Sequence, residues 1–199
     1  KFAIAYNNLG NAMYESHRAK ESLQYFKEAI KINPNYHEAY NGLGDAYRFL
    51  GDKDNAIENF QTSIKINSNY AQAYNNLGMI LSDYSMFDEA LSYYKKALLI
   101  NPIDEKYYNN MGNLLSSLGQ YDKATEAYNQ AIKIKPNFAK AYSNNLLNLN
   151  YKLNFDFKTY LSTAKKFRSN CVTKEEKLPL KYHYEKKPKK LKLGLVSSD

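Results

Sequence analysis

Apolar and polar residues follow a pattern that repeats every 34 residues along most of the chain. Within each repeat, two stretches carry apolar residues at three- to four-residue spacing, which indicates two amphipathic helices. Turn-forming residues close each repeat, after near-copies of one phrase: AIKINPNY, SIKINSNY, ALLINPID and AIKIKPNF. The pattern therefore predicts two-helix units at residues 3–36, 37–70, 71–104 and 105–138, with a partial fifth unit from residue 139.

Small and aromatic residues also recur in phase within these units. Glycine inside a helix costs about 1 kcal/mol relative to alanine, so a periodic glycine indicates that two helix backbones approach closely. Large and small residues at this spacing interdigitate between antiparallel helices, and we expect these columns to be core. They are Gly10, Gly44, Gly78 and Gly112 at position 8; Phe26, Phe60, Tyr94 and Tyr128 at position 24; and Tyr6, Tyr40, Tyr74, Tyr108 and Tyr142 at position 4.

A 34-residue period with two helices per unit is typical of tetratricopeptide arrays. Over residues 3 to about 151, the chain resembles the tetratricopeptide repeat family. One such unit cannot bury its apolar face alone, so neighbouring units must stack. The resemblance implies an all-α fold, a right-handed superhelix or α-solenoid, whose default function is to hold an extended partner.

A second set of columns is polar and occupies positions 5, 6 and 9 of each first helix. Asparagine is a poor helix former, so its recurrence in phase needs another explanation. Positions 4, 7, 8 and 11 are committed to packing, and we expect positions 5, 6 and 9 to face the inner wall of the superhelix instead. The columns are Asn7, Asn41, Asn75 and Asn109; Asn8, Asn76, Asn110 and Asn144, with Gly42 as the exception; and Asn11, Asp45 and Asn113.

A row of side-chain amides predicts a binding site for the backbone of an extended peptide, because each amide offers a donor and an acceptor. A solvated polar face without a function is the alternative. Replacing Asn76, Asn110 and Asn144 with alanine is expected to leave the fold intact or firmer, because alanine is the better helix former. Position 5 carries no lysine, which argues against a carboxylate clamp, and the scattered histidines predict no metal site.

Charge is distributed unevenly. Residues 1–138 carry 14 Lys+Arg and 15 Asp+Glu, whereas residues 139–199 carry 14 and 5. A basic segment can attract nucleic acid or membranes, but these lysines flank a predicted linker, so we expect neither partner. The single cysteine excludes a disulfide framework, no apolar run is long enough to span a membrane, and Lys1 begins no signal-peptide pattern. We expect a cytoplasmic location.

The periodic pattern ends after residue 151. Residues 152–171 carry apolar residues at helical spacing and predict a helix that covers the open end of the array. Lysines and two prolines indicate an exposed linker at residues 172–190. The phrase LKLGLVSSD, residues 191–199, predicts a short C-terminal strand, the first of a truncated α/β domain.

The chain is similar to the N-terminal part of protein O-linked N-acetylglucosamine transferases, particularly bacterial ones. The similarity lies in the order of its segments: the asparagine columns, the phrase YSNNLLNLNY, a helix, a linker and the phrase LKLGLVSSD. The resemblance implies a substrate-recruiting arm of an enzyme that moves N-acetylglucosamine from UDP-GlcNAc to Ser or Thr. It also implies that Asn8, Asn76, Asn110 and Asn144 bind the substrate backbone.

The same resemblance places the catalytic machinery after Asp199, so we expect no catalytic residue and no cofactor within the chain. Two alternatives stay open: a stand-alone scaffold for protein complexes, and the arm of a SPINDLY-type protein O-fucosyltransferase. In each case the expected partners are extended segments of other proteins, and a homodimer through the repeats is compatible with all three.

Overall fold

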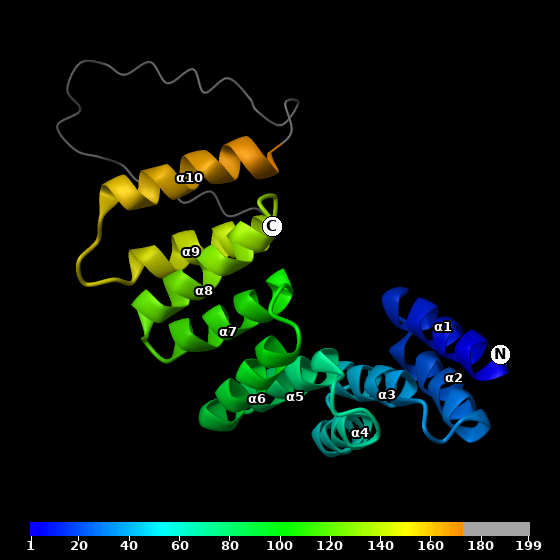
Figure 1. The fold of residues 1–199 in the computed structure, drawn as a ribbon. Coiled ribbons are helices and arrows are strands. Elements are labelled where there is room, and N and C mark those ends of the chain that lie inside the picture. The colour runs from blue at the N-terminus through cyan, green and yellow to red at the C-terminus, as the bar shows by residue number, and fades with distance from the viewer. Residues whose placement is uncertain (173–199) are drawn as a thin grey trace.

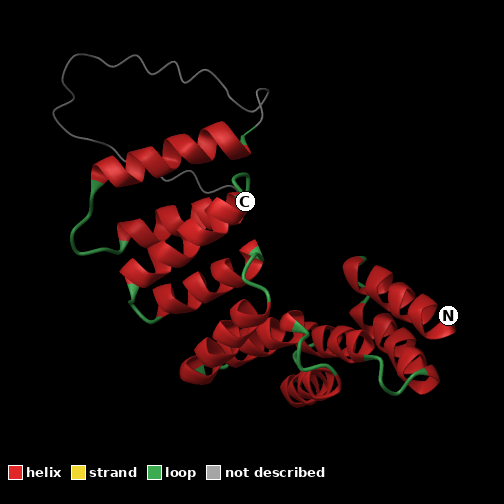
Figure 2. Cartoon of the chain, in the orientation of Figure 1, coloured by secondary structure: helices red, strands yellow, loops and turns green. Residues whose placement is uncertain are grey.

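The computed structural model describes residues 1–172, which form ten helices and no strand (Figure 2). The helices are α1 (Phe2–Glu15), α2 (Ala19–Ile32), α3 (His37–Phe49), α4 (Lys53–Ile66), α5 (Ala71–Asp83), α6 (Phe87–Ile100), α7 (Glu105–Ser117), α8 (Tyr121–Ile134), α9 (Ala139–Asn150) and α10 (Phe157–Cys171). No helix in this part of the chain is both long enough and apolar enough to cross a membrane. The predicted linker beyond Val172 and the predicted strand lie outside the described residues.

Helix pairs follow one another along a curved path, with α1–α2 at one end and α9–α10 at the other (Figure 1). Each odd-numbered helix contacts the next odd-numbered helix, whereas no even-numbered helix within residues 1–172 contacts the next even-numbered one. The odd-numbered helices are therefore closer together and form the inner, concave side of the array. The predicted all-α solenoid is confirmed.

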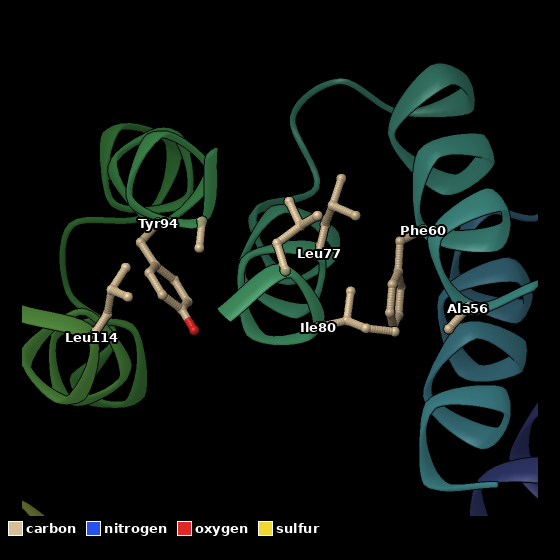
Figure 3. Close-up of a cluster of buried hydrophobic side chains, with 8 residues drawn as sticks. Ala56, Phe60, Leu77, Ile80, Tyr94 and Leu114 are labelled. Carbon is tan, nitrogen blue, oxygen red and sulfur yellow. The ribbon is translucent and has the colours of Figure 1, made fainter. Parts of the chain in front are cut away.

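The aromatic column at position 24 forms the centre of the core. Phe26, Phe60, Tyr94 and Tyr128 are at most 3% exposed. Figure 3 shows this packing around α5, where Ile80 points toward Phe60 of α4 and Tyr94 of α6 lies beside Leu114 of α7. Phe26, Phe60 and Tyr94 thus join their own units to the next ones.

The position-8 glycines make room for these aromatic rings. A Cβ atom on Gly44 would lie 2.6 Å from Cε1 of Phe60, and one on Gly78 would lie 2.9 Å from Cε1 of Tyr94. The expected cause, close approach of two helix backbones, is therefore only part of the reason. At position 4, where the tyrosines were expected to be core, Tyr142 is buried and the other four are only partly buried, of which Tyr74 packs against the core around Ala97.

Replacing Gly78 with leucine should lower the free energy of unfolding by about 1–3 kcal/mol, the usual cost of overpacking a core. The new side chain would meet the ring of Tyr94 and, at 3.2 Å, the backbone oxygen of Ala90, which cannot move aside. Urea denaturation followed by circular dichroism measures the change. An unchanged midpoint would mean that the glycine column is not at a helix contact.

The turn within each helix pair requires a positive φ at position 15. Glycine supplies it at Gly51 (φ 79°) and Gly119 (φ 70°), but His17 (φ 60°) and Ser85 (φ 62°) take the same conformation. A left-handed backbone costs a residue with a Cβ atom roughly 1–2 kcal/mol, and glycine adopts it freely. The first and third units are therefore strained at this turn.

Ser85→Gly should raise the free energy of unfolding by up to about 1 kcal/mol. The substitution removes the backbone strain at this turn, but glycine also raises the conformational entropy of the unfolded chain, which offsets part of the stabilisation. The reverse change at the equivalent turn, Gly119→Ser, is the matched control and should destabilise the chain by a similar amount. Urea midpoints of the two variants check this. A shift in the same direction for both would contradict it.

Candidate functional site

The position-5 asparagines of the concave side point into the array. Asn7, Asn41, Asn75 and Asn109 are only 3–6% exposed. The expectation that positions 5 and 6 face away from packing was therefore wrong at position 5, and at position 6 it was wrong for Asn76, which is 7% exposed. These residues lie at the junctions between consecutive first helices, and burial of an amide is costly unless it is hydrogen-bonded.

The position-6 asparagines donate hydrogen bonds to the buried position-5 asparagines across the unit junctions. Nδ2 of Asn76 donates to Oδ1 of Asn41 at 3.1 Å. Nδ2 of Asn110 donates to Oδ1 of Asn75 at 3.0 Å, and Nδ2 of Asn144 donates to Oδ1 of Asn109 at 3.0 Å. We call this set of three bonds the asparagine ladder. It joins unit two to three, three to four, and four to five.

Position 9 adds further acceptors to two of these junctions. Nδ2 of Asn76 also donates to Oδ2 of Asp45 at 2.9 Å, and Nδ2 of Asn144 donates to Oδ1 of Asn113 at 2.9 Å. At the junction between them, position 9 is Met79, and Asn75 lies 3.5 Å from its sulfur. Aspartate and asparagine therefore serve the same role at this position.

The ladder has no bond between the first and second units. Position 6 of the second unit is Gly42, which has no amide to donate. Oδ1 of Asn7 is buried and has no hydrogen-bond partner within residues 1–172. A Cβ atom on Gly42 would lie 2.4 Å from Cε1 of Phe26, so the aromatic ring occupies the space that an asparagine side chain would need.

Among the acidic residues of the concave side, Asp45 has the pKa that is shifted furthest from its ordinary value. Burial raises the pKa of Asp45 from 3.8 to about 7, although Arg48 and the hydrogen bonds from Asn76 and Asn41 act in the opposite direction. Desolvation dominates because the inner wall keeps water away from the charged form. This carboxyl group therefore holds its proton to a higher pH than an ordinary surface aspartate does.

Two hollows on the concave side are lined by residues of the polar columns. One, of about 360 Å³, lies between α7, α8 and α9 and includes Asn113, Asn144 and Leu147. The other, of about 180 Å³, lies beside the ladder gap and includes Asn7, Gly42 and Asp45. A larger hollow of about 550 Å³ lies at the α7–α8 turn and the α9–α10 connection, but no column residue lines it.

Several residues of the polar columns also reach the surface of the concave side. Asn8, Asn11 and Asn113 are exposed, and Asn110 and Asn144 are partly exposed. Amides of this kind can bond to the backbone of an extended segment. No group of three or more His, Cys, Asp or Glu side chains that could hold a metal ion occurs within residues 1–172. Peptide binding by the exposed asparagines stays a prediction.

One signal in the sequence could have revealed the ladder. Every ladder bond joins residues 35 apart, one more than the 34-residue period, so position 6 of one unit meets position 5 of the unit before it. Adjacent asparagines repeated at a fixed period are consistent with pairing between units as well as with binding.

The geometry defines a class of protein, a solenoid of helical hairpins with a polar concave face. Family models described as tetratricopeptide repeat match residues 2–69 and 71–138, which together exceed half of the chain. The chain belongs to the tetratricopeptide repeat family.

Among solved structures, the chain is similar to the MamA protein, with 26% identity over 98% of each chain and a TM-score of 0.68. It is also similar to YrrB, described as a tetratricopeptide protein with an unusual peptide-binding site, with 22% identity over 84% of this chain and 85% of that one and a TM-score of 0.61. A third match is PilF of Pseudomonas aeruginosa, with 16% identity, coverage of 86% and 78%, and a TM-score of 0.77. The last two likenesses show the fold alone. No curated protein matches the chain.

Proposed function

We propose that the concave face binds an extended segment of a partner protein. The observation that carries this proposal is the pair of hollows on the concave side, both lined by polar-column residues. A rigid array that presents such hollows can hold a segment at several points without changing shape. The description of YrrB as a protein with a peptide-binding site is consistent with this use of the fold.

The exposed members of the columns would make the contacts, and the ladder would fix their spacing. Asn8, Asn11 and Asn113 offer exposed amide groups along the inner helices, while the buried asparagines hold consecutive helices in register. Contacts of this kind read the peptide backbone, and the hollows add side-chain selectivity. Several neutral hydrogen bonds of about 0.5–1.5 kcal/mol each suit a reversible partner.

A steric block on the concave face tests this function. Peptides are first selected on the wild-type chain from a random displayed library. Ser117 is exposed and lines the 360 Å³ hollow, and its hydroxyl donates to the backbone oxygen of Asn113 in its own helix. Ser117→Arg should weaken peptide binding by about tenfold or more, the equivalent of at least one or two lost hydrogen bonds.

Gln61→Arg is the matched control, because Gln61 is exposed on α4, an even-numbered helix on the outer side of the array. Fluorescence-polarisation titration of labelled peptides should give the wild-type affinity for this variant. Equal losses for both variants, or a loss for Gln61→Arg alone, would place the bound peptide elsewhere.

We also propose a finer role, the substrate-recruiting arm of a protein O-GlcNAc transferase. It is supported by the sequence resemblance that ends in LKLGLVSSD, a phrase that lies outside the described residues. Incubation of the full-length protein with radiolabelled UDP-GlcNAc or GDP-fucose and an acceptor protein tests it. Transfer from UDP-GlcNAc is expected. Transfer from GDP-fucose would favour the SPINDLY-type alternative, and no transfer from either donor would favour a stand-alone scaffold.

A further inference from the structure

The 180 Å³ hollow lies where Gly42 interrupts the asparagine ladder. Asn7, which lines it, is 5% exposed, and its Oδ1 atom has no hydrogen-bond partner within residues 1–172. At the next three junctions the equivalent oxygen accepts from an asparagine Nδ2 at 3.0–3.1 Å. A buried acceptor without a donor is rare and costly, so a donor from outside the chain fits here.

The charge of the hollow favours a cationic donor. Both charged side chains that line it, Glu38 and Asp45, are acidic. Oε2 of Glu38 lies 3.0 Å from Nδ1 of His37, and the Glu38 side chain is 39% exposed. Arg48, the cation that acts on Asp45, does not line the hollow, and its guanidinium lies 3.3 Å from the carboxylate of Asp83.

We propose that this hollow binds the charged end of a lysine or arginine side chain from the partner segment. The proposal rests on the proposed function, since the side chain belongs to a peptide held on the concave face. A volume of about 180 Å³ is smaller than the roughly 300–1,000 Å³ of small-molecule sites, so it suits one side chain and not a cofactor. A lysine ammonium offers three donors, one each for Asn7, Glu38 and Asp45.

The state of Asp45 supports a cationic ligand. Desolvation makes its half-buried carboxyl group costly to ionise, and its pKa is about 7. A bound cation would stabilise the ionised form, so a basic side chain should bind more tightly at pH 8 than at pH 6. The titratable groups that act on or face Asp45 are Arg48 of the same helix, Tyr14 of α1 and Tyr70 before α5.

The test compares library-selected peptides with copies in which each lysine or arginine is replaced in turn by norleucine. On the wild-type chain, replacing the engaged residue should weaken binding by about tenfold or more, because bonds to charged groups are the stronger ones. On Asp45→Asn, the same replacement should change affinity by less than about twofold. Asn113 fills the equivalent position in the fourth unit and accepts from Asn144, so Asp45→Asn keeps the ladder.

Asp83→Asn is the control variant, because Asp83 is an exposed acid on α5 that pairs with Arg48 and does not line the hollow. Replacing the engaged lysine or arginine of the peptide with norleucine should weaken binding to Asp83→Asn as much as it weakens binding to the wild type. Equal losses on wild type and Asp45→Asn, or no loss on either, would overturn this inference while peptide binding itself still stood. Failure of every selected peptide to bind the chain in solution would overturn the proposed function, and the inference with it.

Discussion

Replacing Asn76, Asn110 and Asn144 together with alanine should lower the free energy of unfolding by about 3 kcal/mol or more. Each substitution removes a bond across a unit junction and leaves the oxygen of Asn41, Asn75 or Asn109 buried without its donor. An unsatisfied buried acceptor costs about 1–3 kcal/mol, which exceeds the few tenths that alanine gains as a helix former. The structure thus reverses the expectation from the sequence that this variant would be unaffected or firmer.

Asn8→Ala is the matched control for the triple variant. Asn8 occupies the same position in the first unit, but it is exposed and has no preceding unit to bond within the chain. Its removal should leave stability unchanged or slightly higher. Urea denaturation of the triple variant, the control and the wild type measures the difference, and a triple variant as stable as the control would mean that the ladder bonds contribute nothing.

The stability of the chain should depend on pH through Asp45. Its pKa is about 7 in the folded chain and near 3.8 in an unfolded one, so the folded state holds the proton more tightly. The chain therefore loses stability as pH rises from about 4 to about 7, and the full cost is present above that range. The difference between the two pKa values corresponds to at most about 4 kcal/mol.

Asp45→Asn isolates this effect from the other titrating groups. The variant and the wild type should have similar free energies of unfolding at pH 4, and the variant should be more stable at pH 8 by up to about 4 kcal/mol. Urea midpoints of both proteins across this pH range give the comparison. A constant difference between them at all pH values would mean that the folded chain does not shift the pKa of Asp45.

The fold could be predicted from the sequence because local and global signals agree. The glycine at position 8 and the aromatic residue at position 24 are separated by 16 residues in every unit, and the structure brings each pair into contact. Contacts between units were harder to predict. The period shows that Asn75 and Asn109 are equivalent, but not that Asn75 accepts from Asn110.

The candidate site was predicted only in part, for the same reason. The polar columns were placed correctly on the first helices, which form the concave side. A polar residue at a fixed period looks the same in the sequence whether it faces solvent or a neighbouring unit. The departure at Gly42 was visible, but its consequence for Asn7 depends on where Phe26 places its ring, which only the structure shows.

Nuclear magnetic resonance titration of the isotope-labelled chain with a selected peptide tests peptide binding at the concave face most directly. The side-chain amide signals of Asn8, Asn11 and Asn113 should shift on binding, because these groups are exposed on the concave surface. Signals of the buried Asn41, Asn75 and Asn109 should shift little, because they are held in the ladder. Shifts confined to α2, α4, α6 and α8 would contradict binding on the concave face.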